Sequence, residues 1–203
     1  MTLEADYLIV GAGAMGMAFA DVLVHESNAT AIIIDKRDLP GGHWNTAYPF
    51  VTLHQPSAFY GVNSMTLGQN RIDSDGWNEG LYELATNSEV CHYFQRVMVE
   101  KLLPSGRIQF VPNAELTSDG SVVSTVTGQV IELDAKKIVD ATYMKVQVPA
   151  MRPPDFPVAD GVSCVPVNGL PDMAGPNRSY VIIGAGKTGM YACLWLLGRG
   201  VDP

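Results

Sequence analysis

The sequence predicts an α/β protein in which a β-α-β sheet with a β-meander is followed by the start of a second unit of the same kind. Two glycine-rich turns carry this prediction, Gly11–Gly16 and Gly184–Gly189, because each lies between a short apolar run and a helical pattern. Such apolar runs are typical of strands buried on both faces of a parallel sheet. Short alternating segments between residues 107 and 142 predict the meander.

The first β-α-β unit is expected within residues 7–35. Tyr7–Val10 predicts one strand, and Ala31–Ile34 predicts the next, which ends at Asp35. A crossover helix between two strands of one sheet makes them parallel. Apolar residues at i, i+4, i+7 and i+8 predict that this helix buries Met15, Phe19, Val22 and Leu23.

A long irregular stretch and a second helix follow. Residues 39–80 are interrupted by prolines and glycines and interleaved with aromatics, and such a stretch is more often functional than structural. The next helix is expected to begin near Asn87. Its expected buried stripe comprises Val90, Phe94, Val97, Met98 and the aliphatic stem of Lys101. The strands of the meander are expected to cover a parallel sheet.

The C-terminal part predicts a linker and a second nucleotide-binding unit. We expect a dinucleotide-binding domain over residues 1–150, a Pro/Gly-rich connection over 151–178, and the first strand and helix of a truncated domain over 179–203. Its strand is Tyr180–Ile183, and its helix carries an apolar stripe that we expect to be poorly packed or covered by another copy: Met190, Cys193, Leu194 and Leu197.

Composition excludes several classes of function. The formal net charge is −8 and basic residues are not clustered, which makes nucleic acid or an anionic membrane a poor partner. The N-terminus lacks the features of a secretory signal, which favours a cytoplasmic protein. The three cysteines form no C-x-x-C pair, so neither a zinc site nor a dithiol redox centre is indicated, and we expect buried, inert thiols.

The first glycine motif has the spacing of a Rossmann-like dinucleotide site. Gly11 permits a tight turn, Gly13 permits close approach of a pyrophosphate, and Gly16 permits close packing of helix and strand. Phosphates then lie at a helix N-terminus, and Ala12, Ala14 and Met15 belong to the same turn. Asp35 is expected to accept hydrogen bonds from the adenosine ribose and to disfavour a 2′-phosphate, although a solvated surface role is the alternative.

The second motif, Gly184-x-Gly186-x-x-Gly189, has the same flanking pattern. Lys187 lies at the expected helix N-terminus, where it would favour phosphate or would simply be solvated.

Together these motifs, with "IIIDKRDLPGGHW" and "KIVDAT", resemble the two-dinucleotide-binding flavoproteins, and within them the flavin-containing monooxygenases. The resemblance covers the whole chain as the N-terminal half of a longer enzyme. It implies FAD at the first motif, with Lys36 beside Asp35, and NADPH or NADH at the second. Gly42, His43 and Trp44 would lie beside the flavin, and the segment with His54 and Gln55 would line its ring. For both histidines a plain loop role stays open. Ala114 would meet the adenine, and Ala141 and Thr142 would form an interdomain hinge touching FAD.

The resulting functional hypothesis is an FAD-dependent, NAD(P)H-using oxidoreductase of monooxygenase type that acts on a small organic substrate. The resemblance implies hydride transfer from NADPH to FAD and then oxygen transfer. No catalytic side chain and no metal is predicted. The alternatives are a flavin-linked dehydrogenase and a non-catalytic fragment that needs a partner chain or a second copy. The lack of C-x-x-C argues against a disulfide reductase.

Overall fold

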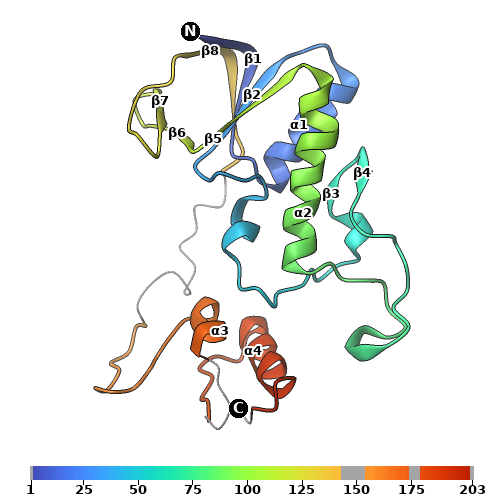
Figure 1. The fold of residues 1–203 in the computed structure, drawn as a ribbon, viewed down its shortest axis with the longest axis vertical. Helices are drawn as coiled ribbons and strands as arrows, with labels where there is room; N and C mark the ends of the chain where they lie inside the picture. Colours follow the sequence, from blue (N-terminus) through green and yellow to red (C-terminus); the bar gives the residue numbers. More distant parts are fainter. Residues whose placement is uncertain (1, 143–153, 174–178, 202–203) are drawn as a thin grey trace. The chain divides into compact units, whose positions relative to one another are not determined.

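The chain folds into two compact units in the computed structural model (Figure 1). The structure describes residues 2–142, 154–173 and 179–201. Among these, unit 1 comprises residues 2–46 and 52–142, and unit 2 comprises residues 47–51, 154–173 and 179–201. The predicted domain boundaries after residues 150 and 178 lie at positions outside this description.

The centre of unit 1 is a parallel four-stranded sheet with the strand order β5-β2-β1-β8. Its strands are β1 (Leu3–Val10), β2 (Ala31–Asp35), β5 (Ile108–Pro112) and β8 (Leu133–Asp140). The predicted α/β class is therefore confirmed. The expectation that the strands of the meander only cover a parallel sheet is wrong for β5 and β8, because each joins that sheet beside β2 or β1.

One face of the sheet is covered by an antiparallel hairpin of β6 (Ala114–Leu116) and β7 (Val122–Ser124) (Figure 1). Leu8, Ile32 and Ile34 pack against this hairpin in one buried cluster with two hairpin residues, Ala114 and Val122. Because side chains alternate along a strand, the fully buried Ile9 and Ile33 point to the opposite face.

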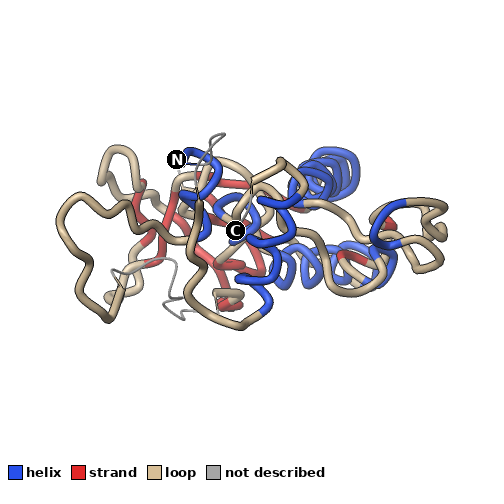
Figure 2. Tube along the Cα trace, turned by 90° about the horizontal axis from the view of Figure 1, so that it is seen from below, coloured by secondary structure: helices blue, strands red, loops and turns tan. Residues whose placement is uncertain are grey.

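That opposite face is covered by helices α1 (Ala14–Glu26) and α2 (Asn87–Val97), which lie together to one side of the strands (Figures 1 and 2). The predicted stripe of α1 is wrong in part. Met15 is 73% exposed and Val22 is also exposed, whereas the buried face comprises Gly16, Met17, Ala20, Asp21 and Leu23. Small residues allow the helix to approach the sheet, and a search for large apolar residues overlooks them.

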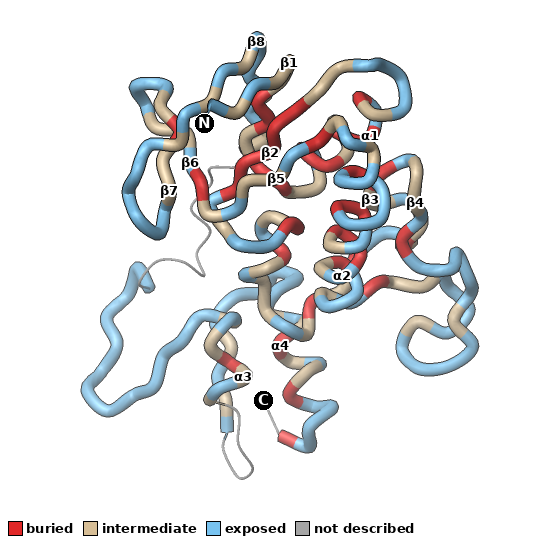
Figure 3. Tube along the Cα trace, turned by 45° about the horizontal axis from the view of Figure 1, so that its top comes forward, coloured by how far each residue is buried: buried red, intermediate tan, exposed pale blue. Residues whose placement is uncertain are grey.

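Helix α2 begins as predicted, and its packing follows the prediction except at Lys101. The Thr86 side chain accepts from the Glu89 amide, and the Glu89 carboxylate accepts from the Thr86 amide, which forms a capping box. Val90, Phe94, Val97 and Met98 are fully or almost fully buried, and Figure 3 shows buried and exposed stretches alternating along α2. The predicted burial of the Lys101 stem is wrong, because Lys101 is exposed. The helix continues as a π-helical turn, η4 (Met98–Leu102), and a 3-10 turn, η5 (Leu103–Ser105), before Gly106 ends it.

The irregular stretch between β2 and α2 is built of short elements. They are η1 (Gly42–Thr46), η2 (Ser57–Phe59), β3 (Gly61–Val62), β4 (Met65–Thr66) and η3 (Gly76–Asn78). The buried carboxylate of Asp21 in α1 accepts hydrogen bonds from the amide and hydroxyl of Ser64, which fixes the β3-β4 hairpin against that helix.

Unit 2 contains η7 (Val167–Gly169), α3 (Leu170–Met173) and α4 (Lys187–Leu197) around a small core. The strand predicted at Tyr180–Ile183 is absent from the described residues. The segment still alternates, with Tyr180 and Ile182 packed on the core and Val181 and Ile183 exposed. An extended segment becomes a strand only when a neighbour completes its hydrogen bonds, and the described part of unit 2 offers none.

The apolar stripe predicted for α4 is mostly solvent-exposed. Met190, Leu194 and Leu197 are exposed, whereas Ala192 and Leu196 are buried in the core. The prediction of buried cysteines is wrong, because Cys164 is exposed and Cys91 and Cys193 are half-buried. Among the described residues, no helix is long and apolar enough to cross a membrane.

Candidate dinucleotide sites

The first glycine turn joins β1 to α1 at the carboxyl edge of the sheet. Gly11 has a φ of +106°, a backbone conformation that residues with a side chain rarely adopt. Its amide donates to the Ile34 carbonyl over 2.8 Å. A Cβ at Gly16 would lie only 1.9 Å from the Gly11 carbonyl oxygen. The helix therefore approaches the turn so closely that only glycine fits at position 16, as the motif predicts.

A second loop lies directly against this turn. The Gly41 amide donates to the Ala12 carbonyl over 2.8 Å. A Cβ at Gly42, whose φ is +60°, would lie 2.9 Å from the Cα of Gly13. Backbone thus meets backbone at Gly13 and Gly42, which the sequence analysis had assigned to the same cofactor through separate motifs.

The end of β8 supplies the third segment. A Cβ at Gly11 would lie 3.3 Å from Cγ2 of Thr142, and the Ala141 amide donates to the Val10 carbonyl over 2.9 Å. Asp140 fixes this segment because its carboxylate accepts from both the amide and the hydroxyl of Thr142. Three segments that are far apart in the sequence therefore meet at the N-terminus of α1.

This N-terminus is available to an anion. Gly13 occupies the N-cap without a side-chain hydrogen bond, and the first turn of α1 contains no acidic residue. Free amides at such a position and the helix dipole both favour a phosphate. Met15, in that first turn, presents an exposed side chain.

Asp35 is buried and oriented by the turn itself. Its exposed fraction is 6%, Oδ2 accepts from the Ala12 amide over 2.8 Å, and Oδ1 accepts from the Arg37 amide over 2.9 Å. Each carboxylate oxygen can accept a further hydrogen bond. The solvated-surface alternative is therefore wrong, and the ribose contact stays a prediction.

The segment after Asp35 contacts the start of the hairpin. The Asn113 amide donates to the Arg37 carbonyl over 3.0 Å, and the Thr125 hydroxyl lies 3.4 Å from the Lys36 carbonyl. Ala114, directly after Asn113, is buried under the sheet. The structure thus brings the backbone beside Ala114 to the Lys36–Arg37 segment, although no sequence motif connects them.

Trp44 is buried, and its Nε1 donates to the Tyr60 hydroxyl over 2.7 Å. The Asn87 side chain donates to the Trp44 carbonyl, so α2 also holds this loop. Burial of the imidazole and the positive charge of Arg37 lower the pKa of His43. The His43 ring lies 5.4 Å from that of Trp44. Trp44 thus packs within unit 1, and Tyr60 is a partner that the sequence did not reveal.

His54 and Gln55 lie on the exposed surface of the loop that precedes η2. The Gln55 side chain donates to the Phe59 carbonyl over 3.2 Å, which gives it a local structural role. Their predicted contact with a flavin ring stays a prediction.

The second glycine turn repeats the geometry of the first. Gly184 has a φ of +124°, and a Cβ at Gly189 would lie 2.4 Å from the Gly184 carbonyl oxygen. Gly186 caps α4 with φ −78° and ψ 172°, close to the φ −80° and ψ −174° of Gly13. This likeness confirms that the two motifs form the same kind of turn, although Gly184 and Gly186 face open space.

The first turn of α4 carries polar side chains. Lys187 has its Nζ 5.6 Å from the ring centroid of Tyr191, and desolvation lowers the Lys187 pKa. Tyr48 hydrogen-bonds the Thr188 side chain. No sequence pattern connects residue 48 with residue 188, so the contact between Tyr48 and this turn is evident only in the structure.

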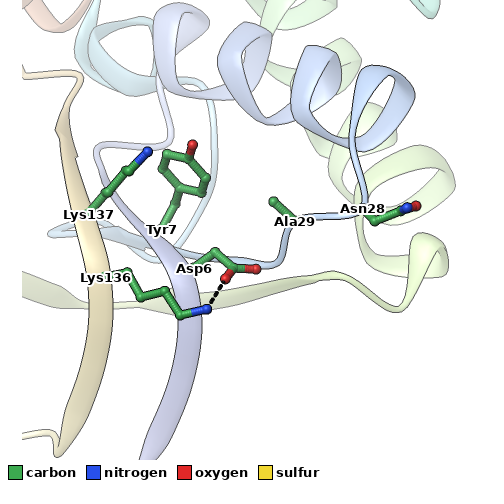
Figure 4. Close-up of a pocket in the computed structure, with 6 residues that line it drawn as sticks. All are labelled: Asp6, Tyr7, Asn28, Ala29, Lys136 and Lys137. Atoms are coloured by element: carbon green, nitrogen blue, oxygen red, sulfur yellow. Dashed lines mark hydrogen bonds and ion pairs between the residues drawn. The ribbon is translucent and has the colours of Figure 1, made fainter.

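Two cavities in the described part of the chain lie away from both turns. One, of about 340 Å³, is lined by residues from the middle of β1 and β8 and from the loop before β2, with the Asp6–Lys136 ion pair across it (Figure 4). The other lies between the hairpin and β8.

A family model described as NAD(P)-binding Rossmann-like domain matches residues 9–70, the segment that contains the first turn and Asp35. Over 202 residues the chain is 53% identical to an uncharacterized protein of Mycobacterium tuberculosis (strain H37Rv) and to one of Mycobacterium bovis. It covers 37% of the length of these relatives.

Solved structures share the fold along nearly the whole chain. The closed crystal structure of cyclohexanone monooxygenase has a TM-score of 0.54 at 24% identity, and covers 99% of this chain and 37% of its own. A cyclohexanone monooxygenase mutant from Rhodococcus sp. Phi1, bound to NADP+, has a TM-score of 0.53 at 23% identity and covers 97% and 37%. The predicted resemblance to two-dinucleotide-binding flavoproteins is thereby confirmed at the level of the fold.

Proposed function

We propose that the chain forms the FAD-binding part and the beginning of the NAD(P)H-binding part of a flavin-dependent oxidoreductase of monooxygenase type. The observation that carries the proposal is the pair of glycine turns with one geometry, of which the first is completed by Asp35 and by the segments around Gly42 and Thr142. A small organic substrate and a cytoplasmic location belong to the same proposal.

FAD is the proposed occupant of the first turn, for which the matching family model names NAD(P). Both molecules contain adenosine diphosphate, and the turn, the α1 N-terminus and Asp35 address this shared half. The carboxylate of Asp35 disfavours a 2′-phosphate, which argues against NADP there. The resemblance of the sequence motifs to flavin-containing monooxygenases favours FAD rather than NAD as the occupant.

In this proposal the residues of the chain bind the cofactor and orient it. The amides at the start of α1 hold the diphosphate, and Asp35 holds the ribose while fixing the turn through Ala12. Gly42 and Gly13 allow the two loops to pack backbone against backbone beside the N-terminus of α1. The bound flavin and nicotinamide supply the redox chemistry, namely hydride transfer and reaction with dioxygen.

The test is anaerobic reduction of the FAD-loaded chain by NADPH or NADH, followed by admission of air. We expect loss of the visible flavin bands with either nucleotide and their return with oxygen consumption. Gly189→Ala should retain FAD and lose the reduction, because its Cβ would collide with the Gly184 carbonyl. FAD that stays oxidised in the wild-type chain, or reduction that is unchanged in Gly189→Ala, would contradict the proposal. Reoxidation that never oxygenates any organic substrate would favour the dehydrogenase alternative.

A further inference from the structure

A short segment from the first half of the chain forms part of unit 2. Residues 47–51 interrupt unit 1, which resumes at Thr52. Phe50 packs on the core of unit 2, and its ring stacks on Trp195 with a centroid distance of 4.8 Å and an interplanar angle of 21°. The Arg199 guanidinium lies 4.1 Å from the Trp195 ring centroid on this helix end.

Tyr48, Phe50 and Trp195 form a row of three aromatic rings in contact. The Tyr48 ring lies 4.8 Å from that of Phe50, so the Phe50–Trp195 stack fixes where the Tyr48 side chain can lie. The hydroxyl then hydrogen-bonds the side chain of Thr188. Burial raises the pKa of Tyr48. The phenol is therefore protonated at neutral pH, and the bond joins two neutral hydroxyls.

Thr188 has a special place in the second motif. It lies in the first turn of α4, directly before Gly189, whose close approach to Gly184 shapes the whole turn. A group that holds the Thr188 side chain therefore restricts the turn whose amides would meet a diphosphate. Tyr48 does so from a position only four residues after Trp44, on the loop that follows the Gly13–Gly42 contact.

We propose that Tyr48 is a positioning residue of the second dinucleotide site, which orders the first turn of α4 through Thr188 before the nucleotide binds. The inference rests on the proposed function, in which that turn takes NAD(P)H. A preformed turn lowers the ordering cost of binding, so the effect falls on nucleotide affinity. Simple ring packing would instead be served equally well by phenylalanine.

The decisive variant is Tyr48→Phe in the FAD-loaded chain, because it keeps the ring stack and removes one oxygen atom. We expect the dissociation constant for NADPH and the KM for flavin reduction to rise about fivefold, as loss of one ordinary hydrogen bond predicts. The limiting rate of reduction and FAD retention should be unchanged. Tyr82→Phe, in an exposed loop of unit 1, is the matched control.

Variants of Thr188, the residue that Tyr48 contacts, separate this positioning role from a general loss of packing. Thr188→Val should weaken NADPH binding similarly, Thr188→Ser should restore it, and the double variant with Tyr48→Phe should be no weaker than either single variant. Unchanged NADPH affinity in Tyr48→Phe, or strictly additive effects in the double variant, would overturn the inference while the proposed function stands. A wild-type chain that holds FAD but binds no NADPH would overturn both.

Discussion

The amide of Ala12 donates a 2.8 Å hydrogen bond to Oδ2 of Asp35, across 23 positions of the sequence. The bond joins the glycine turn after β1 to the last residue of β2, and both lie at the carboxyl edge of the sheet. Asp35 is therefore part of the turn's own architecture as well as the residue expected at the ribose. Loss of the Asp35 charge should therefore affect both the stability of the turn and the binding of the ribose.

Asp35→Asn should destabilise the chain and abolish FAD retention. An amide offers one oxygen, so one of the two donors, Ala12 or Arg37, would face an NH2 group. An unsatisfied buried donor costs about 1 to 3 kcal/mol. Urea unfolding gives the loss in the free energy of unfolding, and Asp38→Asn, at an exposed position, should change neither quantity. Equal stability of Asp35→Asn and the wild type would show that the hydrogen bond to Ala12 is dispensable.

Gly16→Ala should disrupt the first turn. The new Cβ would lie 1.9 Å from the Gly11 carbonyl oxygen, which is backbone and has no freedom to rotate away. We expect a cost of about 1 to 3 kcal/mol, as for overpacked cores, together with loss of FAD binding. Gly198→Ala is the control, because its Cβ would make ordinary contacts of 3.4 Å or more at a helical φ of −61°. Thermal unfolding and FAD titration of both variants test this, and a fully stable Gly16→Ala would refute the predicted clash.

Stability at acid pH should depend on Asp6. Its carboxylate accepts from Lys136 and from the amide and hydroxyl of Thr30, and these contacts lower its pKa from 3.8 to about 2. Because the folded-state pKa is lowered, the contribution is present above pH about 4 and is lost as the pH falls towards 2.

The free energy of unfolding measured at intervals between pH 5 and pH 2 should fall less steeply in Asp6→Asn than in the wild type. Asp75→Asn, in the exposed loop, serves as the control. Parallel pH profiles for the wild type and Asp6→Asn would count against this assignment.

Phe50→Leu should loosen unit 2 while leaving unit 1 intact. The substitution removes the stack on Trp195, and such aromatic pairs contribute about 0.5 to 1.5 kcal/mol beyond their buried area. Hydrogen exchange followed by mass spectrometry should show faster exchange of α4 amides and unchanged exchange of α2 amides. Phe59→Leu, at an exposed site of unit 1, is the comparison. Unaltered exchange in α4 would mean that residues 47–51 do not support it.

Short sequence patterns predicted those elements whose structure depends on residues close together in the chain. The two glycine turns, β1, β2 and the helix α2 follow from runs of apolar residues, turn chemistry and helical periodicity. The partners of β5 and β8 did not follow, because their sequences alternate as edge or meander strands do and only the tertiary fold places them beside β2 and β1.

The candidate site divides in the same way. Gly11, Gly13, Gly16 and Asp35 were found from spacing, and the resemblance supplied Gly42 and Thr142, which the structure brings against Gly13 and Gly11. The contribution of Tyr48 to the second turn was missed, since it depends on a contact across 140 positions between two single hydroxyl groups.

The most direct test of the central claim is the visible absorption spectrum of the purified chain after incubation with excess FAD and removal of unbound flavin. The account predicts retained flavin bands in the wild type, with Asp35→Asn and Gly16→Ala colourless after the same treatment. A colourless wild-type chain, or one that retains NAD in preference to FAD, would contradict the assignment of the first glycine turn to FAD.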